Sequence, residues 1–408
     1  MYRVLVIGHG GREHALCKKF NESTLVEKVY VAKGNDNMND VAEVVNIEED
    51  DFTNLVNFAI NYNIDLTFVG GETSLCLGIV DEFESHNLKI FGPRKKAAKL
   101  EGSKSYCKDL MEKYHIPTAK YDYFSDYETG CNYLDQMALP IVLKADGLAA
   151  GKGVYIAKSY EEAKSNLKTL LASNSRVLIE DYLDGEEFSL MAFVNGDKVY
   201  PLQIAKDYKK AKDGDLGLNT GGMGAYTPVD SIADEYVEMA KNEILIPMAK
   251  ALVKENNPFT GILYAGCMKV KNKVLALEFN VRFGDPETEV LLAALESDLF
   301  VLANNLLDGK EINLQFSNKY YLGLVIASEG YPEKYQKDNI IENLEQVNCD
   351  VIHMGTKLQD DKILSDGGRV LFLLDSGNSL EDARSKVYEE VKKVKAKNLF
   401  YRSDIGNI

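Results

Sequence analysis

The 408-residue sequence lacks any run of about 20 apolar residues, the length needed to cross a bilayer. It begins with a short apolar segment followed directly by glycines, without the longer apolar core and cleavage site of a secretory signal peptide. Its six cysteines and five histidines are scattered, with no C-x-x-C pair. A zinc site and a disulfide framework are therefore not expected, and the thiols are interpreted as reduced in a cytoplasmic protein.

Positive charge is also scarce. The chain has 47 Lys+Arg against 63 Asp+Glu, a net charge of −16. An acidic chain repels phosphate backbones and anionic lipid, so neither nucleic acid nor a membrane is an expected partner. A small phosphorylated substrate stays open, because a pocket can be locally basic. The hydrophobic fraction of 45% is that of a globular protein, and the length predicts about two to four domains.

Residues 1 to about 100 alternate short β-rich runs with helical patterns, which predicts a parallel α/β sheet. Each run ends in glycine or a turn, and such sheets bind ligands at the carboxyl ends of their strands. The predicted strands are Tyr2–Ile7, Val29–Ala32, Asp65–Val69 and Leu88–Phe91.

An α+β region of about 210 residues follows, and a third region begins near residue 317. Hairpins are expected to turn at Asn195–Gly196 and Lys271–Asn272. Pro247 is expected to bend or end a long helical pattern locally. Asp285 is expected to cap a helix that has Pro286 at its first position. A last helix is expected to begin at Ser379, paired with Asp382.

The first candidate site is Gly8-His9-Gly10-Gly11-Arg12-Glu13-His14, where a strand runs into a helix. Its glycines would let a ligand approach the backbone, and a helix start favours anions. Glu13 replaces the third glycine of a dinucleotide motif, and Lys33 stands where that motif needs an acid, so a nicotinamide or flavin site is disfavoured. Two interpretations stay open: Glu13 meets a cationic or hydroxylated ligand, or it is a first-turn glutamate in a tight turn.

The second candidate is the strand–loop–strand Lys144 to Val154, which is rich in small residues. It is not a Walker loop, since Gly153 stands where Ser or Thr must hold magnesium. A glycine-rich hairpin can fold over phosphates, with Lys144 binding a phosphate oxygen, and the alternative is a flexible surface hairpin.

Three further segments combine polar residues with strands or glycines. Val177–Leu183, with Glu187, would suit an adenine and ribose pocket, but is hardly distinguishable from a buried strand and solvated turn. In Glu278–Glu287 the two-residue period places Glu278, Asn280 and Arg282 on one strand face. A carboxylate and an amide oxygen suit magnesium, and the arginine would clamp a carboxylate or phosphoryl group. Asn219–Tyr226 suggests close backbone approach to a ligand or a hinge, and the lysines of Lys206–Lys210 are either anion contacts or solvated surface.

Taken together, these motifs resemble the glycinamide ribonucleotide synthetase (phosphoribosylamine–glycine ligase) family of purine biosynthesis. The resemblance runs almost end to end and is carried by seven motifs in order. They are 10–15, 100–104, 144–154, 219–226, 278–288, 355–357 and 367–370. It implies an ATP-grasp fold: a Rossmann-like N-terminal domain (1–102), an ATP-grasp region (103–316, smaller lobe about 118–190) and a β-rich C-terminal domain (317–408).

The resemblance also implies residue roles. ATP would be bound by Lys104, Lys144, Gly147, Gly151, Lys152, Gly153, Glu180, Tyr182, Leu183 and Glu187. Glu278 and Asn280 would hold Mg²⁺ or Mn²⁺. The substrates would meet Gly10, Gly11, Glu13, Thr220, Gly221, Gly222, Lys357 and Arg369, with Asp207, Arg282 and Asp285 near the reacting groups.

The implied reaction joins glycine to 5-phosphoribosylamine through glycyl phosphate, with ATP converted to ADP and phosphate. The sequence departs from the usual family pattern at His9, Gly71, Tyr208, Leu216, Leu218 and Glu333, and Tyr208 would alter a substrate contact made by His. Two alternatives stay open: another ATP-grasp carboxylate–amine ligase, and a nucleotide-binding protein without turnover. The sequence does not determine the oligomeric state, for which a monomer is the expectation.

Overall fold

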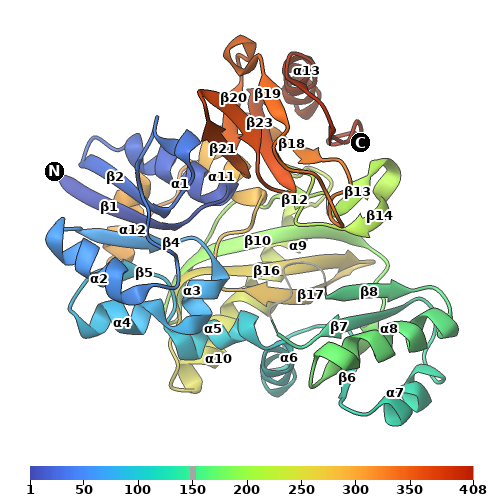
Figure 1. Ribbon diagram of the computed structural model, residues 1–408. Coiled ribbons are helices and arrows are strands. Elements are labelled where there is room, and N and C mark those ends of the chain that lie inside the picture. Colours follow the sequence, from blue (N-terminus) through green and yellow to red (C-terminus); the bar gives the residue numbers. More distant parts are fainter. Residues whose placement is uncertain (148–152, 408) are drawn as a thin grey trace.

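The computed structural model describes residues 1–147 and 153–407 of the chain. Figure 1 shows the N-terminal part in blue beside the C-terminal part in orange and red, with the central strands running below both. A smaller lobe, built around β7, β8 and β9, lies at the other end of the central strands from the N-terminal part. This arrangement leaves the ends of several sheets facing one another near the middle of the molecule.

The N-terminal part is a parallel sheet of five strands in the order β3-β2-β1-β4-β5, which confirms the predicted α/β sheet. Strand β3 was not predicted. Gly8 is the last residue of β1 and Gly70 directly follows β4, so both lie at the carboxyl ends of core strands, where the first candidate motif begins. The elements are β1 (Tyr2–Gly8), α1 (Gly11–Asn21), β2 (Val26–Lys33), β3 (Glu43–Val45), α2 (Phe52–Asn61), β4 (Leu66–Val69), α3 (Glu72–Leu77), α4 (Ile79–Ser85) and β5 (Ile90–Phe91).

Two helices, α5 (Lys95–Gly102) and α6 (Lys104–Lys113), lead into the smaller lobe. The lobe is an antiparallel sheet in the order β6-β9-β7-β8, with its own hydrophobic core under α7 and α8. This core is separate from the two larger cores of the molecule. The elements of the lobe are β6 (Tyr121–Phe124), α7 (Tyr127–Leu134), β7 (Ile141–Ala145), β8 (Val154–Ala157), α8 (Tyr160–Ser173) and β9 (Val177–Asp181).

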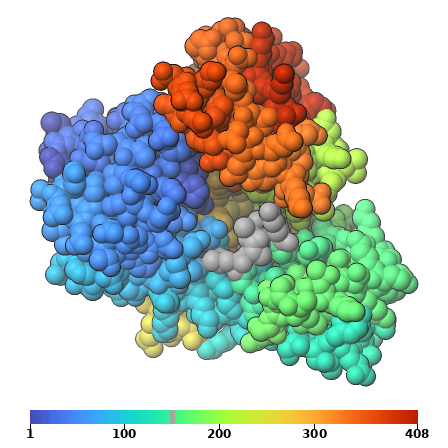
Figure 2. All heavy atoms as spheres, viewed as in Figure 1, coloured from blue at the N-terminus to red at the C-terminus, as the bar shows by residue number. Residues whose placement is uncertain are grey.

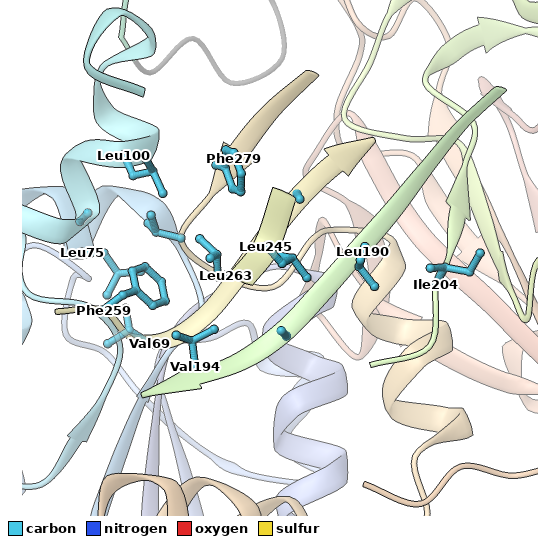
Figure 3. Packing of buried hydrophobic residues seen from close by; sticks show 14 of the residues in the cluster. Val69, Leu75, Leu100, Leu190, Val194, Ile204, Leu245, Phe259, Leu263 and Phe279 are labelled. Carbon is cyan, nitrogen blue, oxygen red and sulfur yellow. The ribbon is translucent and has the colours of Figure 1, made fainter. Parts of the chain in front are cut away.

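The central sheet has the order β11-β10-β16-β17 and contains both predicted hairpins. The sequence patterns of these strands are mostly apolar, and Figure 3 shows their buried side chains in contact with those of the N-terminal part. Leu190 and Leu263 of the sheet share one core with Val69 and Leu100. The strands are β10 (Glu186–Asn195), β11 (Lys198–Pro201), β16 (Thr260–Val270) and β17 (Lys273–Asn280).

Two helix expectations concern this region. The long helical pattern is interrupted just before Pro247, as its expected bend or end allows: a π-helical turn, Lys241–Leu245, links α9 (Asp234–Ala240) to α10 (Ile246–Lys254). The prediction that Asp285 caps a helix is wrong. The next helix, α11 (Glu287–Ala294), has Pro286 at its N-cap and no side-chain cap, because the Asp285 carboxylate instead pairs with Arg369 at 2.8 Å. Helix α12 (Leu299–Leu307) follows.

The C-terminal part is built on a sheet in the order β12-β15-β18-β23-β20, with β25 also paired to β18. Two of its strands, β12 and β15, come from the glycine-rich middle of the chain, so that segment is fixed beside the C-terminal residues. The strands are β12 (Lys206–Asp207), β15 (Gly224–Thr227), β18 (Tyr320–Ser328), β20 (Asp350–His353), β23 (Arg369–Gly377) and β25 (Leu399–Phe400).

Smaller elements complete the C-terminal part. The predicted last helix is confirmed as α13 (Leu380–Val391), whose Ser379 cap accepts a hydrogen bond from the Asp382 amide at 3.1 Å. A hairpin pairs β13 (Lys210–Lys212) with β14 (Leu216–Asn219). A second sheet joins β21 (Thr356–Gln359), β22 (Lys362–Ser365), β19 (Ile340–Glu342) and β24 (Lys395–Ala396).

Across the described residues, no helix combines the length and apolar character needed to span a membrane. All six cysteines are free thiols, and Cys17, Cys107 and Cys267 are buried.

Candidate active site

Two lysines expected to bind phosphate approach one carboxylate at the end of the central sheet. Lys104 begins α6, which Ser103 caps through its side chain, and its Nζ lies 3.4 Å from Glu278 Oε2 on β17. Burial would raise the pKa of this carboxyl group, but three lysines outweigh burial and lower it to about 2: Lys104, Lys209 and Lys144. Glu278 is therefore ionised in a cationic environment. Its side chain stays 35% exposed, so a ligand can reach it.

Glu180 lies between two lysines in the buried part of the site. It forms an ion pair with Lys144, and Lys108 Nζ lies 2.7 Å from its Oε2. None of the three side chains is more than 7% exposed. Burial would raise the pKa of Glu180, but the two lysines hold it below its ordinary value. Sequence reasoning missed Lys108, although it follows Lys104 by four residues and so shares its helix face.

The segment after the smaller lobe brings a third lysine to the site. The sequence did not decide whether Lys209 contacts an anion or lies on a solvated surface. In the structure it forms an ion pair with Glu187 on β10, and its side chain is about one third exposed. Burial, opposed by Lys209, raises the pKa of Asp207 to about 8, and Glu287 adds to the rise. Asp207 is thus a carboxyl group that can exchange a proton near neutral pH.

Glu278 and Asn280 lie two residues apart on β17, opposite Gly266 and Tyr264 of β16. A carboxylate and an amide oxygen on one strand face suit a hard divalent cation. Among the described residues, no group of three or more His, Cys, Asp or Glu side chains could hold a metal ion. A cation bound by Glu278 and Asn280 would therefore complete its shell with water and ligand oxygens, as magnesium does in nucleotide sites, and the donor set fits that role.

The base of the glycine-rich loop is tied to the start of α6. Asp146 Oδ2 accepts a hydrogen bond from the Ser105 hydroxyl at 2.6 Å, next to Lys104. Gly147 has a φ of +117°, which favours glycine, and the Gly153 carbonyl accepts from the Ala145 amide at 2.8 Å. Gly151 and Lys152, also expected to bind ATP, lie outside the described residues.

The expected adenosine segment follows β9, directly after the Glu180 ion pairs. Tyr182 is 39% exposed and Leu183 is half-buried, between the last residue of β9 and the first of β10. The structure therefore places Glu180, Tyr182, Leu183 and Glu187 along one connected edge beside the lysines.

A cleft of about 610 Å³ separates the N-terminal and C-terminal parts. In Figure 2 the blue N-terminal part and the orange C-terminal part face each other across a central hollow. Glycine-rich turns and charged side chains from both parts form its walls. Of the residues expected at the substrate, the cleft is lined by Gly10, Gly11, Glu13, Asp285 and Arg369, and by the divergent His9.

Glu13 performs a local structural role as well as lining the cleft. Its Oε2 accepts a hydrogen bond from the Gly10 amide at 2.7 Å, and its Oε1 accepts from Arg12 Nε at 2.7 Å. A Cβ on Gly70 would lie 2.1 Å from the same carboxylate, so the glycine is required for this approach. Glu13 does lie in the first turn of α1, and its buried carboxylate fixes the glycine-rich wall of the cleft. Its contact with a ligand stays a prediction.

The opposite wall is organised by Arg369. Its Nη1 pairs with Asp285 Oδ1 at 2.8 Å and donates a hydrogen bond to the Gly221 carbonyl at 2.8 Å. Gly222, with a φ of +114°, packs against Pro286, and its amide donates to the Thr220 hydroxyl at 3.0 Å. The 220–222 segment thus holds the Arg369 guanidinium through the Gly221 carbonyl.

Several residues expected near the substrates are absent from the cleft lining: Asp207, Thr220, Gly221, Gly222, Arg282 and Lys357. Lys357 and the divergent Tyr208 have other partners. Lys357 pairs with Asp338 at 2.5 Å and is absent from the cleft lining. The Tyr208 hydroxyl accepts a hydrogen bond from the Gly406 amide at 3.0 Å, and the Arg402 guanidinium lies 5.1 Å from its ring. In this structure Tyr208 therefore contacts the segment from Arg402 to Gly406.

Arg282 is held by two carboxylates that sequence reasoning did not assign. Its Nε lies 3.0 Å from Glu72 Oε2 at the start of α3, and its Nη2 lies 2.8 Å from Glu101 Oε1 at the end of α5. Glu101 also accepts from the Val281 amide at 2.8 Å. Burial raises the pKa of Glu101 to about 7 against the opposing effect of Arg282. The only sequence signal was position: Glu72 follows a strand-ending glycine pair, and Glu101 precedes Lys104 by three residues.

A Rossmann-like sheet, a two-lobed site with converging lysines and a β-rich C-terminal part define a protein of the ATP-grasp class. The fold matches that of biotin carboxylase from Campylobacter jejuni, with a TM-score of 0.72 at 13% identity over 98% of this chain and 92% of that one. At that identity the likeness shows the fold alone.

The chain belongs to the phosphoribosylglycinamide synthetase family. The N domain of that family matches residues 2–101, the ATP-grasp domain residues 102–288 and the C domain residues 321–408. The phosphoribosylamine–glycine ligase of Halalkalibacterium halodurans is 50% identical over 99% of this chain and 96% of its own length. That of Lactococcus lactis is 46% identical over 99% of both. The crystal structure of the Thermotoga maritima ligase has a TM-score of 0.87 and 32% identity, covering 99% of this chain and 100% of that one.

Proposed function

We propose that this chain joins glycine to 5-phosphoribosylamine, converting ATP to ADP and phosphate, and so forms N1-(5-phosphoribosyl)glycinamide in purine biosynthesis. One observation carries the proposal: a lysine-lined site around Glu278 is connected through Arg282 to the 610 Å³ cleft between the N-terminal and C-terminal parts. In this proposal a nucleotide site and a second substrate site would be contiguous. Full-length identity of 50% to a phosphoribosylamine–glycine ligase supports the choice of substrates.

The chemistry requires activation because glycine's carboxylate has no adequate leaving group. A carboxylate oxygen attacks the γ-phosphorus of ATP, the bond from that phosphorus to the bridging oxygen breaks, and ADP leaves. The amine nitrogen of phosphoribosylamine then attacks the carbonyl carbon of glycyl phosphate, phosphate leaves, and the nitrogen loses one proton. Catalysis in this scheme depends on positioning and charge neutralisation, and needs no protein nucleophile.

The nucleotide would lie between the smaller lobe and the central sheet. Lys104, Lys144 and the loop from Gly147 to Gly153 would hold the phosphate oxygens, and the edge from Glu180 to Glu187 the adenosine. Glu278 and Asn280 would hold Mg²⁺ or Mn²⁺, which supplies positive charge at the phosphates. Lys209 would share the neutralising role, since it approaches the same carboxylates.

The substrates would meet on the other side of Arg282. Arg282 would stabilise the acyl phosphate, and Asp207 would accept the proton that the amine loses. Asp285 would position Arg369 against the phosphorylated substrate. Gly10, Gly11, Glu13 and the 220–222 segment would shape the pocket, and Lys357 would contribute only after leaving Asp338.

The remaining features of the proposal concern organisation. The domains would span 1–102, 103–316 and 317–408, with the smaller lobe over about 118–190, close to the family's matched ranges. We propose a monomer in the cytoplasm, because free thiols such as these six stay reduced in that compartment.

The test is an ADP-release assay in which glycine, phosphoribosylamine and Mg²⁺ are withheld in turn. Turnover should require all three, and ¹⁸O from the glycine carboxylate should appear in the phosphate. Phosphate free of that label would overturn the acyl-phosphate route. ATP binding without turnover under every combination would instead indicate a nucleotide-binding protein.

A further inference from the structure

Two arginines from distant parts of the chain share the same two acceptors. Glu72 Oε2 lies 3.0 Å from Arg282 Nε and 4.0 Å from Arg12 Nη1. The Phe283 carbonyl accepts a hydrogen bond from Arg12 Nη1 at 3.2 Å and from Arg282 Nη1 at 3.3 Å. Two like charges are therefore brought together by one carboxylate and one carbonyl.

The two arginines face different substrates of the proposed reaction. Arg12 lines the cleft and binds Glu13, which fixes the glycine-rich wall. Arg282 is held on its far side by Glu101, whose other contact is the Val281 amide at the end of the central sheet. The ion pairs form a continuous series, Glu13–Arg12–Glu72–Arg282–Glu101, from the cleft wall to the nucleotide side.

Glu72 is the only member of this series shared by the two arginines, and it is itself accessible. Its side chain is 25% exposed and lines the cleft, whereas the side chains of Arg12 and Arg282 are 11% and 16% exposed. Burial would raise its pKa, but Arg282 outweighs burial and Arg12 adds to the effect, lowering that pKa to about 2. A ligand that draws Arg12 toward the cleft must change how Glu72 divides its interaction between the two guanidinium groups.

We propose that Glu72 is a positioning residue that couples the two substrate sites: occupancy of the cleft beside Arg12 sets the orientation of Arg282 toward glycine. The inference rests on the proposed function for the identity of the two substrates. Coupling of this kind is reciprocal, so glycine and the phosphorylated sugar alter each other's affinity by the same factor.

The experiment measures glycine binding by calorimetry, with Mg²⁺ and a non-hydrolysable ATP analogue, in the absence and presence of ribose 5-phosphate. In the unmodified protein, ribose 5-phosphate should change the glycine dissociation constant by roughly five-fold or more. Glu72→Gln should reduce that factor to near one, while Glu72→Asp, which keeps the charge, should restore part of it. Glu48→Gln is the matched control, because Glu48 lines the same cleft but pairs with Lys33 at 2.6 Å.

Arg12→Lys provides a second route. Arg12 contacts Glu13 through Nε and reaches Phe283 and Glu72 through Nη1, and a lysine keeps the charge but has no second nitrogen to make both sets of contacts at once. It too should remove the coupling, which keeps the test decisive if Glu72→Gln does not fold. Coupling that survives both substitutions, or that is absent from the unmodified protein, would overturn the inference. So would an equal loss in Glu48→Gln. Glycine-dependent ADP release without coupling would sink this inference alone, whereas no glycine-dependent release at all would sink the proposed function.

Discussion

Acid should destabilise the contact between the N-terminal and C-terminal parts through a pair of histidines, His14 buried and His353 half-buried. His14 on α1 and His353 on β20 are stacked with ring centroids 5.8 Å apart, and the His353 amide donates to His14 Nδ1 at 2.9 Å. His353 Nδ1 also lies 2.9 Å from the Thr356 hydroxyl, at the edge of the cleft. A proton on His14 Nδ1 would break the amide hydrogen bond and place a charge where water cannot reach it.

The magnitude follows from the two pKa values. Burial lowers the pKa of His14 from 6.5 to about 4, with a smaller contribution from Lys18, and burial with His14 lowers that of His353 to about 4. A pKa unit corresponds to about 1.4 kcal/mol, so each imidazole accounts for about 3 kcal/mol. Because each ring disfavours a charge on the other, the pair should contribute between about 3 and 7 kcal/mol in total.

The direction is fixed by proton linkage. The unfolded chain binds protons on both histidines near pH 6.5, whereas the folded chain does so only near pH 4. The free energy of unfolding contributed by the pair is therefore complete above pH 6.5 and lost as the pH falls toward 4. Relative to a domain stability of about 5–15 kcal/mol, that loss is large.

Urea unfolding between pH 7 and 4.5 provides the assay, with His353→Asn as the perturbation and His86→Asn as control. At pH 7 the free energy of unfolding of His353→Asn should be lower than that of the unmodified chain. Between pH 7 and 4.5 it should fall by about 3 kcal/mol less than that of the unmodified chain. His86 is exposed beyond α4, so its replacement should leave the pH dependence unchanged. Parallel curves for His353→Asn and the unmodified chain would refute the assignment of acid sensitivity to this pair.

Three further predictions concern turnover. Glu278→Gln should lower kcat by about 100-fold or more, because it removes the charge that would hold the divalent cation at the phosphates, and it should leave the thermal unfolding midpoint near that of the unmodified chain. A near-normal kcat at saturating Mg²⁺ would contradict this role. Lys108→Met should raise the KM for ATP by about ten-fold and leave the KM for glycine unchanged, because Glu180 would then have Lys144 as its one ion-pair partner of the two. An unchanged KM for ATP would remove Lys108 from the nucleotide site. Asp207 should make kcat/KM rise with pH through about 8, where its carboxyl ionises, and Asp207→Asn should flatten that limb; a limb of unchanged position in the variant would assign it to another group.

The strands that organise the site were predictable because their patterns are strong and local. Four apolar runs that end in glycine predicted the N-terminal sheet, and turn residues at Asn195–Gly196 and Lys271–Asn272 predicted both central hairpins. Strand β3 is one exposed and two half-buried residues at the sheet edge, a pattern too short to distinguish it from a loop.

The one wrong prediction arose where a tertiary contact overrides a local signal. Asp285 has the sequence of a helix cap, but its carboxylate is committed to Arg369, 84 residues away along the chain. Pro247 was expected to bend or end its helix locally, and the interruption takes the form of a π-helical turn, which no local propensity specifies. The prediction that Tyr208 alters a substrate contact made by His stays a prediction; its hydroxyl accepts a hydrogen bond from the Gly406 amide.

The candidate site shows the same division. Glu278, Asn280 and Arg282 were predictable as a set because a strand places alternate residues on one face. The partners of Arg282 were not, since Glu72 and Glu101 lie 210 and 181 positions before it, and one sequence carries no record of such pairs.

The charges of the site explain why an acidic protein can accept a polyanion and why it would need a cation to do so. Each lysine here already pairs with a carboxylate: Lys104 with Glu278, Lys209 with Glu187, and Lys144 and Lys108 with the one carboxylate of Glu180. Such pairing keeps the lysines ordered without a ligand, but it leaves little net positive charge for the phosphates of a nucleotide. A divalent cation beside Glu278 and Asn280 would restore that charge. The affinity for a nucleotide should therefore fall steeply when Mg²⁺ is removed. The fall should exceed the one expected of a site whose lysines were unpaired and could neutralise the phosphates themselves.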